Sequence, residues 1–393
     1  MNLLRYIYLP LGALGLVRWL SWLVHRIPAA FYRPVTTGYR ESLAVVTPVY
    51  QEDPDIFRQA IESWLANGVD EVICVIDVTD TVCRDIAAEY PVRIIMTEVP
   101  GKRDALRKGW EAASTVLVAL VDSDTIWAPD VRARVCEPFV DPKVGGVGTR
   151  QSVFKPRTLW QNAADMYLDY RYFDELAAQT VVGQAVSCLS GRTAVYRRLL
   201  LEDVSEEFMN ETFLGIPCLS GDDKRLTCLT IKRGYKTCLQ RNARVWSTFP
   251  AKFTGFRKQR LRWARNTWRS DLRAIGEGWA FRHPMLAFMM VDKMVSGFTL
   301  LSSLAFLILA VVLGHWLIAL TLVCWWFLSR CAKLLPHLRN RPEELRIVPA
   351  FIMVSIVMAV IKIWALITIK EQRWLTRQVQ VEHGEVVRTQ GDP

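Results

Sequence analysis

The stretch TVLVALVDSDTIW, residues 115–127, places two carboxylates directly after an unbroken apolar run. Residues 116–121 have the length and composition of a buried strand, and Asp122 and Asp124 follow one residue apart. Alternate residues of an extended chain point to opposite sides. One aspartate can therefore bind a hard divalent cation, and the other a ribose hydroxyl or the water shell of the same metal. The simpler alternative is a turn in which both aspartates cap the next segment, and the pair alone favours that alternative.

Three more strand-like runs lie in the same part of the chain, between residues 40 and 250. They are SLAVVTPVY (42–50), DEVICVID (70–77) and VRIIMTEV (92–99), and they are separated by segments with apolar residues at helical spacing. This alternation predicts an α/β domain with a mostly parallel sheet. Ligands of such sheets bind beyond the carboxyl ends of the strands, so the candidate residues are those at these ends. They are Thr47, Tyr50, Glu52, Asp77, Asp122 and Asp124.

The composition indicates a mixed architecture. Of the 393 residues, 51% are hydrophobic and 22% are charged, which is too apolar for a purely soluble enzyme and too charged for membrane helices alone. The nine cysteines include no Cys-x-x-Cys pair, which disfavours a disulfide framework or a zinc site and favours a reducing compartment. The net charge of +10 includes basic residues beside the hydrophobic runs, which fits membrane orientation better than nucleic-acid binding.

The first hydrophobic segment, residues 3–24, is interrupted by Arg5 and Arg18. We expect it to span the membrane with its arginines snorkelling to the interface. An interfacial helix is one alternative. A signal peptide is another, and it would place the middle of the chain outside the cell.

The second hydrophobic cluster lies near the C-terminus. Residues 295–313 and 316–328 are joined by a short turn and predict a transmembrane hairpin. A third run, 347–369, contains Lys362, and a lysine at mid-membrane costs about 2.5–3.5 kcal/mol on insertion scales. We therefore expect this run to be re-entrant or interfacial, which keeps Trp374 on the same side as the α/β domain.

A second acidic motif, Gly221-Asp222-Asp223, precedes another helical pattern. Acidic residues at a helix start are favoured by the helix dipole, so an N-terminal cap is one explanation. A carboxylate held in a cleft can also act as a general base. The motif therefore has a structural and a chemical interpretation.

The basic segment that follows contains Gln259, Arg262 and Trp263. Apolar residues then recur at helical spacing among arginines, which predicts an interfacial helix on a membrane surface; a basic helix with a solvated face is the alternative. The apolar residues are Trp268, Leu272, Ile275 and Trp279.

The order of these motifs resembles that in the processive family 2 glycosyltransferases, above all hyaluronan synthases and the chitin and chitooligosaccharide synthases. The similarity runs from about residue 43 to residue 377. It implies a GT-A catalytic domain on the cytosolic side, fused to membrane helices that carry a growing polymer outward. The matching motifs are Asp77, Asp122-Ser-Asp124, Ser190-Gly191, Gly221-Asp222-Asp223 and Gln259-x-x-Arg262-Trp263.

On the donor side, the resemblance implies a site for a UDP-sugar. The TPVYQED motif, with Thr47, Tyr50 and Glu52, and Asp77 would contact the uridine, and Lys102 would lie near the nucleotide. Asp124 would hold Mg²⁺ or Mn²⁺ on the diphosphate, with Asp122 close by. The remaining donor residues are Gln259, Arg262, Trp374 and Arg377.

Two short segments resemble the Trp-Gly-Thr-Arg loop that reaches the donor site in hyaluronan and chitin synthases. RWLTR, residues 373–377, has Leu375 in place of the glycine. GVGTR, residues 146–150, follows the Asp-x-Asp region, so we expect it to be a strand of the catalytic sheet instead.

On the acceptor side, the resemblance assigns Asp223 as the general base and gives Trp263 an aromatic face for the acceptor sugar. VSCLSGRTAVYRR resembles the acceptor segment, which brings Cys188, Ser190 and Gly191 to the terminal sugar. Arg192 stands where related hyaluronan synthases usually have proline.

The resulting prediction is an inverting, metal-dependent glycosyltransferase that polymerises sugar from UDP-sugar and translocates the polysaccharide. Its partners are the UDP-sugar, the growing polysaccharide and the lipid membrane, without nucleic acid, and its place is the inner or plasma membrane. A single-transfer enzyme acting on a lipid or short acceptor is the alternative, and a membrane channel or scaffold with a degenerate nucleotide-binding domain is a third. N-acetylglucosamine, glucose, glucuronate and an alternating pair all stay open as the sugar.

The predicted domains follow from these segments. They are an N-terminal transmembrane or interfacial helix (1–36), a cytosolic catalytic domain (40–254), the Gln-x-x-Arg-Trp segment with its interfacial helix (255–283), membrane helices (285–370) and a cytosolic loop and tail (371–393).

Overall fold

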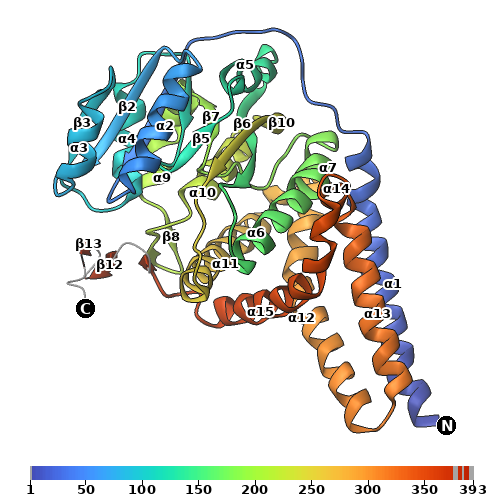
Figure 1. Cartoon of the computed structure of the whole chain (residues 1–393). Helices are drawn as coiled ribbons and strands as arrows, with labels where there is room; N and C mark the ends of the chain where they lie inside the picture. The colour runs from blue at the N-terminus through green and yellow to red at the C-terminus, as the bar shows by residue number, and fades with distance from the viewer. Residues whose placement is uncertain (1, 375–378, 383–384, 389–393) are drawn as a thin grey trace.

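The structure is a computed structural model of the chain and describes residues 2–374, 379–382 and 385–388. Its main body is an eight-stranded sheet with the strand order β3-β2-β1-β4-β7-β6-β10-β5 (Figure 1). Neighbouring strands in the run β3-β2-β1-β4 are parallel, and β6 is parallel to β10. Strand β7 is antiparallel to both β4 and β6, and β5 is antiparallel to β10. The predicted α/β fold with a mostly parallel sheet is confirmed. The strands are β1 (Leu43–Val49), β2 (Glu71–Asp77), β3 (Arg93–Thr97), β4 (Leu117–Leu120), β5 (Thr125–Trp127), β6 (Val144–Val153), β7 (Ala194–Arg197) and β10 (Lys236–Ser247).

Both faces of the central strand β1 are buried, because helices cover the sheet on both sides. Val46 belongs to a core that includes Trp110 of α4 (Lys102–Ala112), and Val45 to a core that includes Trp64 of α2 (Pro54–Ala66). A Cβ on Gly109 would lie 2.2 Å from a methyl group of Val46. The glycine therefore allows the close packing of α4 on β1.

Shorter elements complete this domain. Residues 146–150 lie within β6, as expected. The other elements are α3 (Thr81–Ala87), α5 (Val131–Cys136), η1 (Glu137–Val140), α6 (Leu159–Tyr170), the π-helix η2 (Arg171–Glu175), α7 (Leu176–Val181), α8 (Arg198–Asp203), α9 (Ser205–Met209), β8 (Thr212–Phe213), β9 (Ile216–Pro217) and α10 (Asp222–Lys232).

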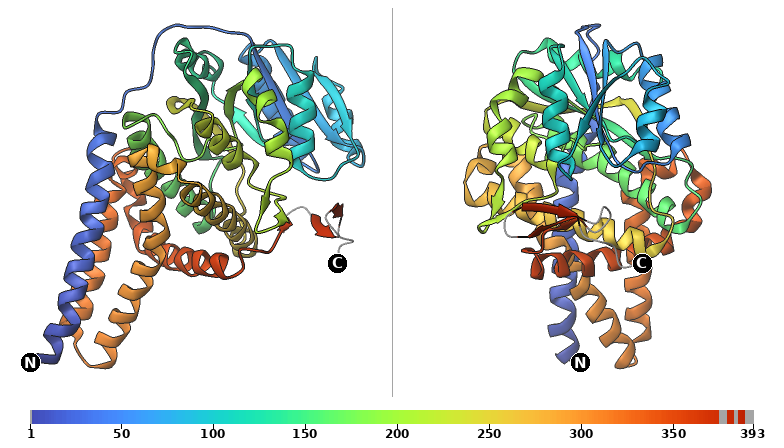
Figure 2. Two further views of the ribbon diagram at one scale, coloured as in Figure 1. Left: turned by 180° about the vertical axis from the view of Figure 1, so that it is seen from behind. Right: turned by 90° about the vertical axis from the view of Figure 1, so that its left-hand side faces the viewer.

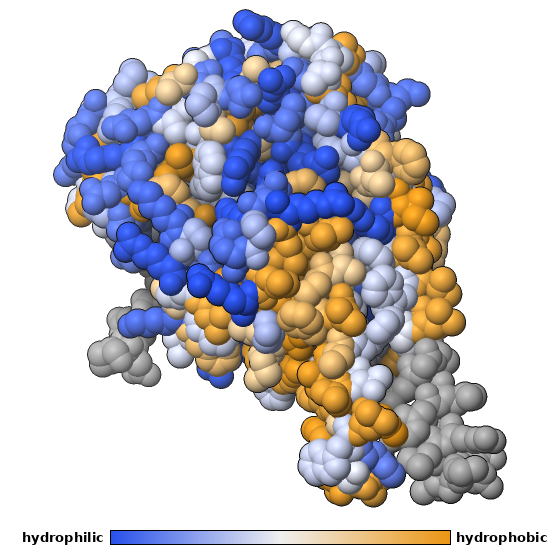
Figure 3. All heavy atoms as spheres, turned by 45° about the vertical axis from the view of Figure 1, so that its right-hand side comes forward, coloured by the Kyte–Doolittle hydropathy of each residue, from blue (hydrophilic) through white to orange (hydrophobic). Residues whose placement is uncertain are grey.

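Three long helices, α1 (Asn2–Ala30), α12 (Pro284–Val312) and α13 (Trp316–Lys333), project side by side away from the sheet domain (Figures 1 and 2). Hydrophobic side chains gather on the projecting helices, whereas hydrophilic ones dominate the sheet domain (Figure 3). Within the part of the chain that the structure describes, three segments are long and apolar enough to cross a membrane. They are Pro284–Val312, Trp316–Lys333 and Pro342–Ile367.

The N-terminal segment forms one continuous helix, α1, and Arg18 lies in it. The sequence predicts a snorkelling arginine here, but Arg18 pairs with Asp292 of α12 instead. The ion pair gives the guanidinium a partner on a neighbouring helix, and its position relative to a membrane stays a prediction. Further along, Trp19 packs on Trp325 of α13 with ring centroids 5.6 Å apart.

An extended segment after α1 docks on β10. The Tyr32 hydroxyl donates to the carbonyl of Leu239 over 2.7 Å and accepts from the backbone N–H of Arg241. Gln240 holds the backbone of Val35 on both sides, since its oxygen accepts from the N–H at 3.0 Å and its amide donates to the carbonyl at 2.8 Å. The helix and the sheet domain are thus joined by a buried polar contact.

The last apolar helix, α15 (Val348–Ile367), runs across the foot of the sheet domain rather than alongside α12 and α13 (Figure 2). Its Lys362 carbonyl accepts from the Trp268 indole N–H at 2.8 Å, and its ammonium donates to Ser296 of α12 at 3.1 Å. Lys362 is therefore bound within the protein. Whether this helix is interfacial or re-entrant in a membrane stays a prediction.

The helix α11 (Phe253–Gly276) packs against α15. The predicted apolar stripe is only partly correct, because α11 ends before Trp279, which lies in the following 3₁₀-helix η3 (Trp279–Arg282). Gly278 separates the two with a φ of 76°, a conformation that ends helices. Trp268 and Trp279 are both buried in the protein, whereas Leu272 is exposed, so the four residues do not form one exposed apolar surface.

Between α13 and α15, the chain forms α14 (Leu335–Leu338) and η4 (Pro342–Ile347). His337 is buried there between two carboxylates: its Nδ1 lies 2.8 Å from Asp169 of α6, and its Nε2 lies 2.7 Å from Glu344. Burial lowers the pKa of His337, but the hydrogen bonds to these carboxylates outweigh it and raise the pKa to about 9. A charged histidine thus joins the helical foot to the sheet domain.

Candidate active site

The carboxyl ends of β1 and β2 carry the first group of candidate residues. Thr47 is buried within β1, and Tyr50 and Glu52 follow in the loop before α2. Asp77 is the last residue of β2, and its Oδ1 accepts hydrogen bonds from the backbone N–H (3.0 Å) and the hydroxyl (2.6 Å) of Thr79. Because β1 and β2 are parallel neighbours, these residues meet at one edge of the sheet.

Asp122 and Asp124 lie between β4 and β5, beside the end of β1. Their carboxylates have different partners. Asp122 Oδ1 accepts from Lys102 Nζ at 2.5 Å, while Asp124 Oδ2 accepts from the backbone N–H of Thr248 at 3.1 Å and from its hydroxyl. Burial raises the pKa of Asp124, and the negative charge of Asp122 adds to the increase. The pair does lie in a turn, in which the N–H of Thr125 donates to the Asp122 carbonyl at 3.0 Å, but the two carboxylates bind Lys102 and Thr248 from other segments.

Lys102 joins the two acidic motifs. Its Nζ lies 2.5 Å from Asp122 and 3.0 Å from Asp222, and its side chain is buried. Burial lowers the pKa of Lys102, but Asp122 and Asp222 outweigh burial and raise it. The sequence predicts a lysine near the nucleotide; it does not predict this double ion pair, because the partners lie 20 and 120 positions away in the chain.

Asp222 and Asp223 lie in the first turn of α10, where the helix dipole favours acidic residues as expected, but the cap position itself belongs to Gly221. Asp223 Oδ1 accepts from the N–H of Lys224 at 2.7 Å, and Oδ2 accepts from the N–H of Gly191 at 3.3 Å. Burial raises the pKa of Asp223, and the negative charge of Asp222 raises it further. For Asp222, burial also favours a higher pKa, but the ion pair with Lys102 outweighs burial and lowers it. Asp222 is thus tied to Lys102, whereas Asp223 forms no ion pair that the structure describes.

The acceptor candidates come together around Asp223. Cys188 Sγ lies 3.7 Å from its Oδ2, and Ser190 and Gly191 follow in the same loop before β7. A Cβ on Gly191 would lie 2.9 Å from Lys102 Nζ, so only glycine fits here without moving the lysine. Trp263 is half-buried on α11 and belongs to the hydrophobic core on this side of the sheet.

The remaining donor candidates lie on α11 and at the C-terminal end. Gln259 and Arg262 are half-buried on α11, next to Trp263. Trp374 belongs to the short strand β11 (Arg373–Trp374), which pairs with β12 (Val379–Glu382), and β12 pairs with β13 (Glu385–Arg388). Leu375 and Arg377 lie outside the described residues.

One contact to the catalytic loop has no signal in the sequence. Gln372, just before β11, accepts a hydrogen bond from the backbone N–H of Leu219 at 3.4 Å, and its amide lies 3.7 Å from the sulfur of Cys218. These residues directly precede Gly221-Asp222-Asp223. The chain leaving α15 therefore returns to the catalytic domain beside the candidate base.

A divalent metal fits this site only if a bound substrate supplies some of its coordinating oxygens. Among the residues described, no three histidine, cysteine or acidic side chains come together as a ready-made cluster. Asp124 is the best donor, because its half-buried carboxylate stands beside a second anion, Asp122, and a cation would relieve that repulsion. Sites with one or two carboxylates that complete their coordination with substrate phosphates are typical of Mg²⁺.

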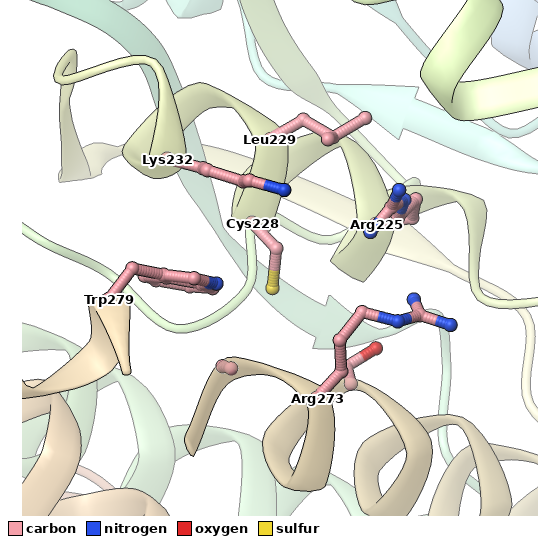
Figure 4. Close-up of a pocket in the computed structure, with 8 residues that line it drawn as sticks. Arg225, Cys228, Leu229, Lys232, Arg273 and Trp279 are labelled. Carbon is pink, nitrogen blue, oxygen red and sulfur yellow. The ribbon is translucent and has the colours of Figure 1, made fainter. Parts of the chain in front are cut away.

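A small pocket lies away from these carboxylates, between α10, α11 and η3 (Figure 4). Cys228 and Trp279 line it together with three basic residues, Arg225, Lys232 and Arg273. Each of the three basic residues already pairs with a glutamate: Glu207, Glu211 or Glu277. The pocket therefore offers no free positive charge to a ligand.

Comparison with known proteins places these residues in a wider context. Residues 40–266 match the family described as "Glycosyltransferase like family 2". An N-acetylglucosaminyltransferase of Rhizobium meliloti is 29% identical over 374 residues, which cover 89% of this chain and 84% of that protein. A hyaluronan synthase of Streptococcus pyogenes is 25% identical and covers 91% and 89%. The fold resembles that of a mannosyltransferase from Pyrobaculum calidifontis, solved with GDP-Man and Mn²⁺, with a TM-score of 0.60, 20% identity and coverage of 90% and 96%.

Proposed function

The chain belongs to glycosyltransferase family 2, and from this premise we propose that it is an inverting, metal-dependent polymerase that uses a UDP-sugar and passes its polysaccharide across a membrane. The observation that carries the proposal is the position of Asp223. This carboxylate lies next to the acceptor loop, with a raised pKa, and an ion-paired lysine separates it from the Asp-x-Asp motif. Base, donor motif and acceptor loop thus form one site.

Asp223 acts as the general base of the proposed reaction. The acceptor hydroxyl attacks the anomeric carbon of the donor sugar and gives its proton to the carboxylate. A new glycosidic C–O bond forms as the bond to UDP breaks, and its electron pair leaves with the diphosphate. Attack from the face opposite the leaving group inverts the anomeric configuration. The hydrogen bond from the Gly191 N–H orients the base.

The leaving diphosphate needs positive charge around it. A Mg²⁺ or Mn²⁺ ion held by Asp124, with Asp122 beside it, would neutralise the phosphate oxygens. Arg262 supplies a permanent cation on α11 for the same group. Lys102 holds Asp122 and Asp222 in place, so the metal site and the base keep a fixed spacing. Thr47, Tyr50, Glu52 and Asp77 receive the uridine at the sheet edge.

We place α1, α12 and α13 across the inner or plasma membrane and the sheet domain in the cytosol. Basic residues follow the hairpin on the side of the sheet domain, in agreement with the positive-inside rule. The helix α15 lies at the membrane surface below the domain, and the segment after it stays cytosolic. The basic residues are Arg330, Lys333, Arg339, Arg341 and Arg346.

A single transfer onto a lipid or short acceptor is the second candidate. It is favoured by the close packing of the projecting helices, since Trp19 stacks on Trp325 and Trp326 donates a hydrogen bond to Ser303 of α12 at 3.2 Å. These contacts leave little room for a polymer between them. Product length on a gel, after incubation with UDP-sugars singly and in pairs, distinguishes the two and also identifies the sugar.

The test of the base is Asp223→Asn in the purified full-length protein. The amide cannot accept the proton, so transfer should fall by about a hundredfold to ten-thousandfold while UDP binding stays largely intact. Transfer is followed as UDP release, and UDP binding by calorimetry. The control is Asp203→Asn, an exposed aspartate on α8 that pairs with Arg233 and should retain full activity. Full activity in Asp223→Asn would refute the assignment.

A further inference from the structure

Two buried arginines lie against the same aromatic side chains near the acceptor loop. Arg192 directly follows Gly191, whose N–H binds Asp223, and Arg192 is only 7% exposed. Arg260, on α11, is 4% exposed. Within the described part of the chain, neither forms an ion pair; Arg192 donates to the amide oxygen of Gln151 at 3.3 Å, and the Nε of Arg260 has no hydrogen-bond partner. Buried charges are normally paired, so these two guanidinium groups are candidates for binding an anionic ligand.

Aromatic rings surround the two guanidinium groups. The Cζ of Arg192 lies 4.3 Å from the ring centroid of Phe249 and 5.2 Å from that of Trp263. The Cζ of Arg260 lies 4.8 Å from the Trp263 centroid and 5.7 Å from that of Tyr167. Aromatic faces pack against the apolar side of a sugar ring, and guanidinium groups bind carboxylates through two parallel hydrogen bonds. The cluster therefore has the chemistry to hold a sugar that carries a negative charge.

The electrostatic environment agrees with this geometry. Burial lowers the pKa of Arg260 to about 10, and the positive charges of Arg192 and Arg171 contribute to the decrease. Arg171 comes from the π-helix η2, an irregularity that is frequent at functional sites. The basic residues of the pocket in Figure 4 differ, because glutamates neutralise them. Excess positive charge thus gathers at the acceptor side of the site.

We propose that Arg192 and Arg260 form an anion site within the acceptor pocket and that the sugar unit which receives the transferred residue carries a carboxylate. The proposal rests on the proposed transferase function and specifies its acceptor. The acceptor loop fixes the location, since Arg192 and the Gly191 N–H that binds the base are adjacent in the chain. A carboxylate attached to the acceptor ring can reach this pair while a hydroxyl of the same ring faces Asp223.

The experiment measures acceptor binding without catalysis. The full-length protein in detergent micelles is titrated calorimetrically with an oligosaccharide that ends in glucuronic acid. It is then titrated with the same oligosaccharide after reduction of the carboxyl group to an alcohol. We expect the carboxylate form to bind about 10- to 100-fold more tightly, the range for a hydrogen-bonded charge pair. Arg192→Gln and Arg260→Gln should each remove most of this preference.

Three further measurements make the test decisive. Arg257→Gln, an exposed arginine one turn before Arg260 on α11, should leave the preference unchanged. Arg192→Lys keeps the charge without the two-pronged geometry and should retain part of the preference, which a variant that merely misfolds would not. UDP release is recorded separately, so loss of the donor reaction is distinguishable from loss of acceptor preference.

Three outcomes would overturn the proposal. Equal binding of the two oligosaccharides by the unaltered protein would show that no carboxylate is recognised. Weaker binding of UDP itself in Arg192→Gln would place the guanidinium on the donor diphosphate. Tighter binding of a polyprenyl-phosphate-linked sugar than of the glucuronate oligosaccharide, lost in the same variants, would assign the anion site to a lipid phosphate.

Discussion

Replacing His337 should remove a pH-dependent part of the stability of this protein. The charged imidazole bonds Asp169 at 2.8 Å and Glu344 at 2.7 Å, and it is 1% exposed, so solvent screening is minor. Its pKa rises from 6.5 to about 9 on folding. At about 1.4 kcal/mol per pH unit, this corresponds to about 3 kcal/mol of the free energy of unfolding.

The direction of the pH effect follows from the raised pKa. The contribution is fully present below pH 6.5, where the imidazole is charged in both states, and it is lost as the pH rises through about 9. His337→Gln keeps a side chain that can form hydrogen bonds but has no charge. It should therefore be less stable than the unaltered protein at pH 6.5, and the difference should shrink above pH 9.

The assay is denaturant unfolding of the full-length protein in detergent at several pH values between 6 and 10. His283→Gln is the control, because burial lowers the pKa of His283, whereas that of His337 is raised. A His337→Gln protein whose stability falls with pH as steeply as that of the unaltered protein would refute the reasoning.

Two further predictions concern the metal and the topology. Asp124→Ala should lose UDP binding that depends on Mn²⁺ or Mg²⁺, because a hard oxygen ligand disappears; calorimetry that finds unchanged metal dependence would rule out this role. A cysteine at Gln380 of β12, in a background without Cys324 and Cys331, should react with an impermeant maleimide only after the membrane is opened. Labelling in intact cells would contradict a cytosolic C-terminal segment.

The parallel half of the sheet could be predicted because its signals are local. Each strand is a short apolar run that ends in a polar residue, so Asp77 and Asp122 were placed correctly at the ends of β2 and β4. The antiparallel strand β5 has no such signal: it is three residues long and depends on pairing with β10, more than a hundred residues away. Sequence patterns do not encode such distant pairing.

The candidate site was likewise predictable in its local motifs but not in its contacts between distant segments. Its acidic residues were recognisable as motifs, but the ion pairs of Lys102 and the unpaired burial of Arg192 and Arg260 depend on how separate segments meet. The end of α11 before Trp279 had a readable signal, since glycines at 276 and 278 interrupt the helical pattern. The orientation of α15 had no signal in the sequence, because hydropathy gives the length of an apolar helix and not its direction.

The docking of the segment after α1 on β10 limits how the catalytic domain can move. The domain is anchored to the helical foot at one side through Tyr32 and Gln240 and at the other through Trp268 of α11, which binds α15. Contacts at two separate points restrict rotation of the domain relative to the helices. In the proposed polymerase, Asp223 would then keep one height above the membrane, and each elongation step would advance the sugar chain past a stationary base instead of rocking the enzyme along its product.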